Sequence, residues 1–336
     1  METKTKINLT HEEIQTLLRH NFGSQTLLTE VLPLKDGWFN TAYLLTLSDD
    51  TRMVLKIAPP PSMPILMYEI NIMRAEVDVM RRVIAQGKAP VPAFLAVDFS
   101  REILPSDYYF MQPLQGQTLD KAEKTMSPAD KESIEEQKGR IAAYFHQIHN
   151  TFFGYPVWQG EAYTQTWRDA FLQIIANILA DAKTYHVRLP KKPENIWKIY
   201  QKHAPLLDEV KTPVLLHFDY WSGNIFIKGQ PGNYEIEGIT DFERAIWGDP
   251  IAELAIDIGS DVDKWIGSAY MRGYESVSGQ PIIFDESART RFLMYKAYLA
   301  MIMVIECAPR SYPLPLHTWI KTYIYQILKQ TLKELG

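Results

Sequence analysis

The sequence lacks the features of a secreted or membrane-spanning protein. Cys307 is its only cysteine, so no disulfide can form within the chain, and a reducing compartment is expected. It contains no run of about 18 apolar residues. The N-terminal segment METKTKINLTHEE has no apolar stretch like that of a signal peptide. We therefore expect a cytoplasmic protein with no membrane partner.

An excess of positive charge is also missing. The 35 lysines and arginines are outnumbered by 40 aspartates and glutamates, which gives a formal net charge of −5 and a pI near 5.9. Nucleic-acid-binding domains are normally basic, so we expect no nucleic-acid partner. Hydrophobic residues make up 46% of the 336-residue chain, enough for the cores of about two domains.

The N-terminal third combines helix and strand signals. A short amphipathic helix is predicted within residues 1–25, with Thr10 as its N-cap. Residues 65–86 predict the main helix of this region, closed by Gly87. Strands are predicted at 43–47, at 53–57, and within 89–99 and 107–114. This order of elements predicts a small α+β lobe.

The remainder of the sequence is mainly helical. Ser127 and Pro128 are residue types typical of an N-cap and a first helical position. Helices are also predicted around 167–182, around 196–203 and over most of 251–335. One short β segment, 214–241, interrupts them. We therefore predict two lobes, residues 1–114 and residues 115–336.

A lysine and a glutamate lie on otherwise apolar surfaces. Lys56 is part of the strand segment MVLKIA, and an edge-strand lysine that reaches water is the alternative interpretation. Glu76 lies on the apolar stripe of the predicted helix, where a carboxylate needs a cationic partner. We predict that Lys56 and Glu76 form an ion pair. Glu69 is a rival on the same face, but its place in the first turns favours exposure.

The segment KDGWFN precedes the strand that leads to Lys56. It contains Gly37 and Asn40 between two predicted strands. A full glycine-rich loop that binds phosphate groups would have further glycines. We predict that Gly37 and Asn40 lie beside the phosphate groups of a nucleotide. A plain hairpin turn is an equally good interpretation.

The segment YYFMQPL at the lobe boundary has features of an adenine-binding linker. Pro113 has no N–H, so Gln112 can offer its C=O and Leu114 its N–H to the edge of a purine. Met111 would then lie at the back of the purine pocket. An ordinary domain linker is the alternative.

Polar residues interrupt the apolar stretch VLLHFDYWSGNIFI. His217, Asp219 and Asn224 lie there, and Asp241 ends the following strand. A hairpin with its turn at 230–233 would bring Asn224 and Asp241 together at its open end. Phosphoryl transfer needs a carboxylate to accept the proton of the attacking hydroxyl, and oxygen ligands for Mg²⁺. We predict that Asp219 is this carboxylate, that Asn224 and Asp241 are metal ligands, and that His217 is a hydrogen-bonded support.

These motifs resemble the aminoglycoside phosphotransferase / choline kinase superfamily, which has a protein-kinase-like fold. The resemblance depends on H-x-D-x-x-x-x-N at 217–224, I-x-D-F-E at 239–243 and G-D-P at 248–250. It extends over roughly residues 30–260, with the segments in the expected order. One departure is the degenerate glycine-rich loop. Another is that Glu253 and Asp257 compete for the position of an Asp that the family usually has after G-D-P.

The resemblance implies an α+β fold of two lobes. The small, β-rich N-lobe with one main helix, 1–114, would bind the nucleotide through the Lys56–Glu76 pair. The larger, mostly helical C-lobe, 115–336, would carry catalysis and the acceptor substrate. It also implies a small-molecule kinase that uses ATP or GTP with Mg²⁺ to phosphorylate a hydroxyl group.

Two other classes of function remain alternatives. A non-catalytic, pseudokinase-like nucleotide-binding module is disfavoured because every chemical position carries a suitable residue type. A metal-dependent hydrolase would use His217, Asp219, Asn224 and Asp241 as ligands, but the eight histidines of the chain do not cluster in sequence.

The acceptor is expected to be a small hydroxylated molecule that carries an amine, such as an aminoglycoside. Asp249 and Glu306 are carboxylates on segments that can line a cleft and attract a cation. The alternative for Glu306 is a surface helix pair with Arg310, four residues further along the chain.

Overall fold

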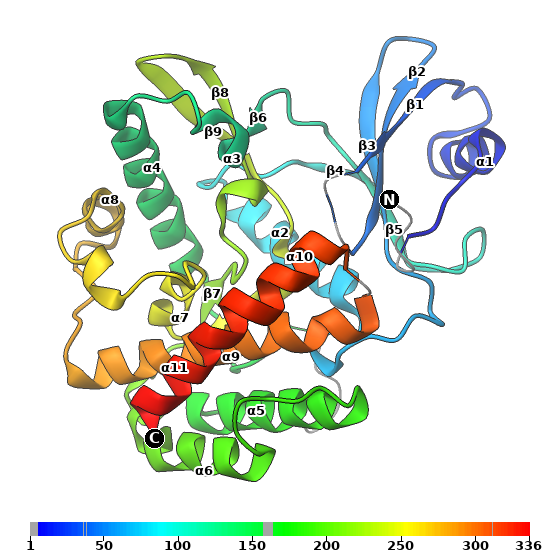
Figure 1. Ribbon diagram of the computed structural model, residues 1–336. Helices are drawn as coiled ribbons and strands as arrows, with labels where there is room; N and C mark the ends of the chain where they lie inside the picture. The colour runs from blue at the N-terminus through cyan, green and yellow to red at the C-terminus, as the bar shows by residue number, and fades with distance from the viewer. Residues whose placement is uncertain (1–5, 36, 38, 157–163, 311) are drawn as a thin grey trace. The chain divides into compact units, whose positions relative to one another are not determined.

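The computed structural model in Figure 1 describes residues 6–35, 37, 39–156, 164–310 and 312–336. These residues form two compact units. The first contains the described residues of Met1–Ile65, Pro92–Gln115 and Arg310–Tyr312, and the second contains Leu66–Val91, Gly116–Pro309 and Pro313–Gly336. The two units do not coincide with the predicted lobes 1–114 and 115–336, because the segment 66–91 groups with the second unit. The division into these lobes therefore stays a prediction.

The first unit is built on an antiparallel sheet. Its strands are β1 (Leu28–Leu34), β2 (Thr41–Leu47), β3 (Arg52–Ile57), β4 (Phe94–Asp98) and β5 (Tyr108–Met111), arranged in the order β1-β2-β3-β5-β4. The predicted strands 43–47 and 53–57 lie within β2 and β3, and β4 and β5 lie within the predicted segments 89–99 and 107–114. The loop that contains Gly37 and Asn40 joins β1 to β2, so it connects two strands as predicted.

One face of this sheet is covered by α1 (His11–Phe22). The helix begins at the predicted N-cap, where the Thr10 hydroxyl accepts the backbone N–H of Glu13 at 3.3 Å. The shared core consists of Ile14, Leu17, Leu18, Leu28, Tyr43, Leu45, Leu47, Met53, Leu55, Ile57, Leu104, Tyr108 and Phe110. Alternate residues of β2 and β3 belong to it, so the residues between them face the other side of the sheet.

Lys56 belongs to that other side. It lies in register with Ala42 of β2 and Tyr109 of β5, so β3 is a central strand of the sheet. The side chain is only 8% exposed. The alternative interpretation of Lys56 as an edge-strand lysine is therefore wrong. The ammonium lies 6.0 Å from the centroid of the Tyr109 ring, at the limit of a cation–π contact.

The predicted helix 65–86 begins later than expected. A 3₁₀ turn, η1 (Met67–Glu69), is followed by Asn71 with a left-handed φ of 56°, and only then does α2 (Ile72–Gln86) begin. Gly87 closes α2 with a φ of 69°, as predicted. Glu69, which we expected to be exposed, is buried, and its carboxylate accepts the backbone N–H of Leu66 at 2.6 Å.

The second unit is largely helical, as expected. Its longer helices are α4 (Pro128–His146), α5 (Trp167–Thr184), α6 (Pro193–His203), α8 (Ala269–Ser278), α9 (Glu286–Arg310) and α11 (Tyr325–Leu335). Shorter ones are α3 (Leu119–Ala122), α7 (Pro250–Leu254) and α10 (Leu314–Trp319). In Figure 1, α4 and α8 pack side by side. The predicted N-cap Ser127 accepts the N–H of Asp130 at 3.1 Å.

Two small sheets interrupt these helices. The strands β7 (Val214–Leu216) and β10 (Ile246–Gly248) form one pair. The strands β6 (Gln117–Thr118), β8 (Ile225–Gln230) and β9 (Asn233–Ile239) form the other sheet. A two-residue turn, Pro231–Gly232, joins β8 to β9 inside the predicted turn. Its Gly232 has a φ of 84°, which favours glycine.

Helix α9 is the long apolar helix of the second unit. Among the described residues it is the one helix long and apolar enough to cross a membrane by those two criteria. Within its most apolar window, 78% of the residues are buried inside the protein. A buried core helix meets the same criteria.

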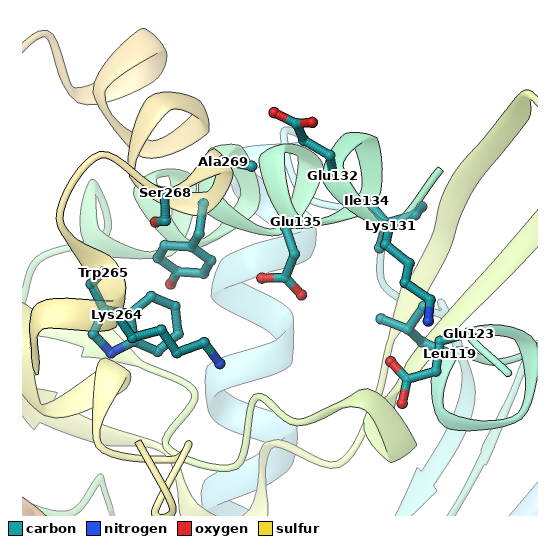
Figure 2. Close-up of a pocket in the computed structure, with 11 residues that line it drawn as sticks. Leu119, Glu123, Lys131, Glu132, Ile134, Glu135, Lys264, Trp265, Ser268 and Ala269 are labelled. Atoms are coloured by element: carbon teal, nitrogen blue, oxygen red, sulfur yellow. The ribbon is translucent and has the colours of Figure 1, made fainter. Parts of the chain in front are cut away.

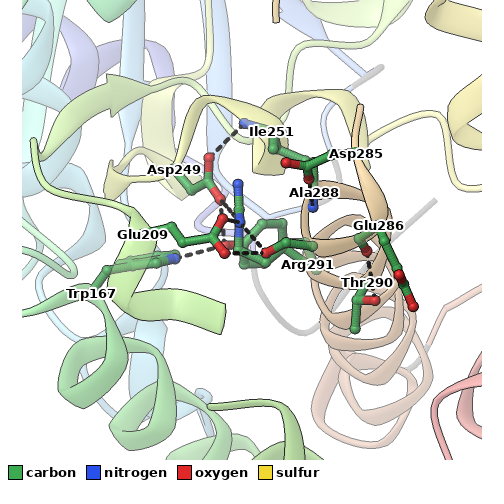
Figure 3. A network of polar contacts seen from close by, with 11 residues as sticks. Trp167, Glu209, Asp249, Ile251, Asp285, Glu286, Ala288, Thr290 and Arg291 are labelled. Carbon is green, nitrogen blue, oxygen red and sulfur yellow. Dashed lines mark hydrogen bonds and ion pairs between the residues drawn. The ribbon is translucent and has the colours of Figure 1, made fainter. Parts of the chain in front are cut away.

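A buried polar network ties α9 to the segment that precedes α7 (Figure 3). Asp249 accepts hydrogen bonds from Nε of Arg291 at 2.9 Å, from the Tyr295 hydroxyl at 2.7 Å and from the Ile251 N–H at 3.1 Å. Tyr295 in turn accepts the indole N–H of Trp167 at 2.7 Å. Asp249 was expected to attract a cationic ligand, but its carboxylate is internal and already paired.

The Asp249→Ala variant is expected to be strongly destabilised. It removes the buried one of the two carboxylates that pair with Arg291, the other being the half-exposed Glu209, and breaking a buried pair typically costs up to about 3–5 kcal/mol. Urea denaturation measures the loss. The control is Glu132→Ala, which removes an exposed ion pair with Arg272 and should cost less than about 1 kcal/mol. Equal losses in the two variants would contradict the assigned role of Asp249.

Candidate active site

The loop between β7 and β8 of the second unit carries Asp219, which is partly exposed. His217 is fully buried, and the next residue, Phe218, has a left-handed φ of 56°. Asp219 follows with a side chain that is 16% exposed. A 3₁₀ turn, η4 (Ser222–Asn224), then leads into β8. The loop therefore turns sharply, so that a carboxylate reaches solvent between two buried strands.

A buried carboxylate holds the start of this loop. The two oxygens of Glu253 accept the backbone N–H groups of His217 and Phe218, at 2.7 and 3.0 Å. Glu253 is 1% exposed, whereas Asp257 makes an ion pair with Lys264, which is half exposed. Of the two acids that competed for the position after G-D-P, Glu253 therefore occupies the buried place beside the loop.

His217 supports the loop through both of its ring nitrogens. Its Nδ1 accepts the backbone N–H of Asp219 at 3.2 Å, so Nε2 carries the proton and donates it to the carbonyl of Thr240 at 3.0 Å. This agrees with the predicted role as a hydrogen-bonded support. Because both nitrogens are engaged, His217 is also unsuited to the metal-ligand role that the hydrolase alternative gave it.

Asn224 packs directly against Asp219. Its Nδ2 donates to the backbone carbonyl of Asp219 at 2.9 Å and to Oδ2 of the same residue at 2.8 Å. The amide oxygen, which is the atom able to bind Mg²⁺, lies on the other side of the planar group. Asn224 can therefore orient Asp219 and still offer an oxygen ligand.

The β8–β9 hairpin brings Asp241 to this place. Ile225 pairs with Ile239, and the N–H of Thr240 donates to the carbonyl of Asn224 at 3.0 Å, so Asp241 comes one residue beyond the last bond of the ladder. The predicted convergence at the open end of the hairpin is confirmed. Asp241 itself has a left-handed φ of 69°. Such strain in a non-glycine residue is typical of functional sites.

The environment of Asp219 affects its protonation. Burial raises the pKa of its carboxyl group above the usual range, and the negative charge of Asp241 raises it further. Arg244, His217 and the hydrogen bond from Asn224 act in the opposite direction. A carboxylate with a raised pKa is a better proton acceptor than an ordinary surface aspartate.

Arg244 was not predicted from the sequence. It lies in the 3₁₀ turn η5 (Phe242–Arg244) directly after Asp241. Its Nη1 is 3.6 Å from Oδ1 of Asp219, and its Nη2 donates to both oxygens of Glu306 at 2.9 and 3.1 Å. Glu306 is 1% exposed and Arg310 4%, so neither residue lies on the surface as the alternative for Glu306 assumed.

The remaining predicted site residues are divided between the two units. Lys56 lies in β3, Gly37 and Asn40 in the β1–β2 loop, and Glu76 in α2 of the second unit. Glu76 is fully buried, and the proposed Lys56–Glu76 ion pair stays a prediction.

The linker residues all belong to the first unit. Met111 ends β5, and the N–H of Gln112 donates to the carbonyl of Ala93 at 2.9 Å. Leu114 follows two residues later. The predicted use of the Gln112 carbonyl and the Leu114 N–H by a purine stays a prediction.

A separate cavity of about 420 Å³ lies between α3, α4 and α8 in the second unit (Figure 2). Trp265 lies on one side, Leu119 and Glu123 lie on the other, and Glu135 points into the space between them. Glu135 is paired with Lys138 at 2.6 Å. None of the predicted site residues lines this cavity, and Asp219, Asn224 and Asp241 lie elsewhere in the unit.

The Glu253→Gln variant is expected to disturb the loop that carries Asp219. An amide has one oxygen to accept two N–H groups, and its NH₂ would face a donor, which costs about 1–3 kcal/mol for the unsatisfied group. The free energy of unfolding, measured by urea denaturation, and the turnover should both decrease. In the control Asp257→Asn, only the pair with Lys264 is lost. If the two variants behave alike, Glu253 does not hold the loop.

The comparison with protein families identifies the chain. The model described as "Phosphotransferase enzyme family" (APH) matches residues 30–293, which is most of the chain. No curated protein matches at a significant level.

Solved structures share the fold over nearly the whole chain. A candidate fructosamine-3-kinase from Thermobifida fusca is 17% identical, with a TM-score of 0.65 over 95% of this chain and 98% of that one. The streptomycin–ATP–APH(2″)-IIa ternary complex is 17% identical, with a TM-score of 0.61 over 97% and 99%. The GDP complex of a mutant aminoglycoside 2′-phosphotransferase-IIIa is 12% identical, with a TM-score of 0.63 over 97% and 100%.

These likenesses agree with the predicted α+β, protein-kinase-like fold, with its antiparallel sheet near the N-terminus and its largely helical remainder. The chain therefore belongs to the phosphotransferase enzyme family and is a small-molecule kinase that phosphorylates an alcohol group.

Proposed function

We propose that the protein transfers the γ-phosphate of ATP or GTP to a hydroxyl group of a small, amine-bearing molecule with the help of Mg²⁺. One observation carries this proposal. Asp219, Asn224 and Asp241 come together at the open end of the β8–β9 hairpin, on a loop fixed by Glu253. They are the proton acceptor and the oxygen ligands that phosphoryl transfer to a hydroxyl requires.

Asp219 accepts the proton of the acceptor hydroxyl as that oxygen attacks the phosphate. The amide of Asn224 holds Oδ2, which leaves Oδ1 as the oxygen that meets the hydroxyl. Burial and the charge of Asp241 raise the pKa of Asp219, and this favours proton acceptance. Glu253 and His217 keep the loop in the conformation that presents this oxygen.

The magnesium site would consist of the Asn224 amide oxygen and the Asp241 carboxylate. Both are hard oxygen donors of the kind that Mg²⁺ prefers, and Mg²⁺ commonly takes only one or two protein ligands besides phosphates and water. When bound, the ion neutralises charge on the phosphate groups. Among the described residues, no three acidic, histidine or cysteine side chains lie close enough together to form a metal site by themselves.

Nucleotide binding is assigned mainly to the first unit. We propose contacts from Gly37, Asn40, Lys56, Met111, Gln112 and Leu114, with Glu76 as the partner of Lys56. The buried, central position of Lys56 supports its role, because a lysine kept there needs anionic partners. The ATP and GDP complexes of the similar structures support a purine nucleotide and leave both ATP and GTP as donors.

The acceptor is proposed to carry an amine. The names of similar structures support this, since streptomycin, other aminoglycosides and fructosamine are hydroxylated amines. Asp249 and Glu306 do not support it, because both are internal and paired with arginines. A cytoplasmic location, without nucleic-acid or membrane partners, remains part of the proposal, and a non-catalytic nucleotide-binding module remains the alternative.

Two substitutions should separate the roles of the acidic residues. Asp241→Ala should abolish the Mg²⁺-dependent increase in melting temperature that ATP or GTP produces, because it removes a metal ligand. Asp219→Asn should keep this increase but lose about 10²–10⁴-fold in turnover, because it removes only the proton acceptor. Thermal shift with each nucleotide, with and without Mg²⁺, measures the first effect, and phosphate release measures the second.

The wild-type protein without Mg²⁺ is the reference for this experiment. Two results would count against the proposal. One is a melting temperature that neither nucleotide changes in the wild type. The other is an equal loss of nucleotide binding in both variants. Nucleotide binding without any turnover in the wild type would favour the non-catalytic module.

A panel of acceptors should show a preference for hydroxylated amines. We expect turnover of aminoglycosides or smaller amino sugars to exceed that of neutral sugars, alcohols and macrolides, and the KM to rise with salt as charge is screened. Coupled detection of ADP or GDP at two salt concentrations measures both. A neutral acceptor with a salt-independent KM would exclude the amine and leave the kinase assignment intact.

A further inference from the structure

Arg244 connects two carboxylates that are far apart in the sequence. Its guanidinium lies between Asp219, at 3.6 Å, and Glu306, which accepts two hydrogen bonds from Nη2. The arginine side chain is 12% exposed and Glu306 only 2%. Little water therefore screens the attraction between these groups, and the pair is stronger than one on the surface.

The far end of this connection is firmly anchored. The Tyr68 hydroxyl donates to Oε1 of Glu306, and the Tyr68 ring stacks on Tyr155 with centroids 5.9 Å apart. Tyr155 and Tyr298 share a hydrogen bond between their hydroxyl groups. The ring of Tyr298 stacks on Phe218, the residue before Asp219, at 6.0 Å. Glu306 is thus held by a buried aromatic cluster that also contacts the catalytic loop.

We propose that Arg244 is a positioning residue for the phosphotransfer reaction, with Glu306 and Tyr68 as its anchors. Asn224 holds Oδ2 of Asp219, and Arg244 faces Oδ1 from the opposite side. Because each carboxylate oxygen of Asp219 has its own partner, the carboxylate prefers one rotation about its Cβ–Cγ bond. The acceptor hydroxyl therefore meets Oδ1 in a fixed orientation. This inference rests on the proposed function of Asp219.

The chemistry of the guanidinium explains why an arginine occupies this place. Its planar fork offers several N–H groups in fixed directions, so one side chain can serve Glu306 and Asp219 together. A lysine ammonium carries the same charge but is a single point on a flexible stem. The charge also offsets the repulsion between Asp219 and Asp241, which is described above.

Hydrolysis of ATP by the Mg²⁺-loaded protein, with water as the acceptor, tests this role without knowledge of the natural substrate. Arg244→Ala should lower kcat by about 10²-fold, the scale of a small misplacement of a reacting group, and leave the KM for ATP unchanged. Arg244→Lys should recover part of the loss. Circular dichroism and melting curves establish that each variant is folded. The matched control is Arg140→Ala, which removes an exposed pair with Glu136 at 2.8 Å and should behave like the wild type.

Chemical rescue separates positioning from a purely structural role. Guanidinium at low millimolar concentration should raise the activity of Arg244→Ala about tenfold over that of the variant alone. Urea, which is planar and similar in size but neutral, should restore none. Rescue by both molecules or by neither, or a KM for ATP that rises as much as kcat falls, would overturn the proposal.

ATP hydrolysis by the wild type separates a failure of the proposed function from a failure of the role given to Arg244. If the wild type hydrolyses ATP and Asp219→Asn does not, the proposed function stands. An Arg244→Ala variant as active as Arg140→Ala then refutes only the role of Arg244. If the wild type shows no Mg²⁺-dependent hydrolysis, the proposed function and this inference both fail. In Glu306→Gln the anchor loses its charge, so an intermediate loss of kcat is expected, again with an unchanged KM.

Discussion

The arrangement of the catalytic loop depends on one buried carboxylate. Glu253 accepts two adjacent backbone N–H groups, those of His217 and Phe218, at the point where the chain leaves β7. Two adjacent N–H groups can converge on one carboxylate only if the backbone turns sharply between them, and Phe218 has a left-handed φ. Burial makes the interaction obligatory, because each N–H left unsatisfied there would cost about 1–3 kcal/mol. The carboxylate thus stabilises a strained turn, and that turn sets the position of Asp219.

His217 joins this turn to the second element of the site. One ring nitrogen binds the N–H of Asp219, and the other binds the carbonyl of Thr240, the residue before Asp241. Asp219 and the segment that leads to Asp241 are therefore held by a single imidazole as well as by the β8–β9 ladder. A displacement of the hairpin would be transmitted to Asp219 through contacts of about 3 Å. This accounts for a buried histidine at the centre of the motif, where both of its ring nitrogens make hydrogen bonds.

Local signals predicted much of this structure, and long-range contacts account for what was missed. Thr10 and Ser127 begin helices and Gly87 ends one, each through hydrogen bonds to residues within one turn, so their residue types alone were informative. The hairpin was predicted from the turn residues at 230–233 between two β-rich segments, and its turn proved to be Pro231–Gly232. Arg244 and Glu306 are 62 residues apart, and no local pattern predicts such a pair. The late start of α2 was missed because Asn71 adopts a left-handed conformation, whereas the apolar spacing of residues 65–86 appeared continuous.

Charge limits where an amine of the acceptor can lie. Arg244 pairs with both Asp219 and Glu306, and the charge of Asp241 also acts on Asp219. A magnesium ion held by Asp241 would balance part of the negative charge of these carboxylates and of the nucleotide phosphates. An amine of the acceptor close to Arg244 would be repelled by the guanidinium. If the acceptor carries an amine, that group should lie away from Arg244, on the part of the molecule that does not react. Selectivity for the amine would then affect KM more than kcat, because the interaction is the same in the ground state and the transition state.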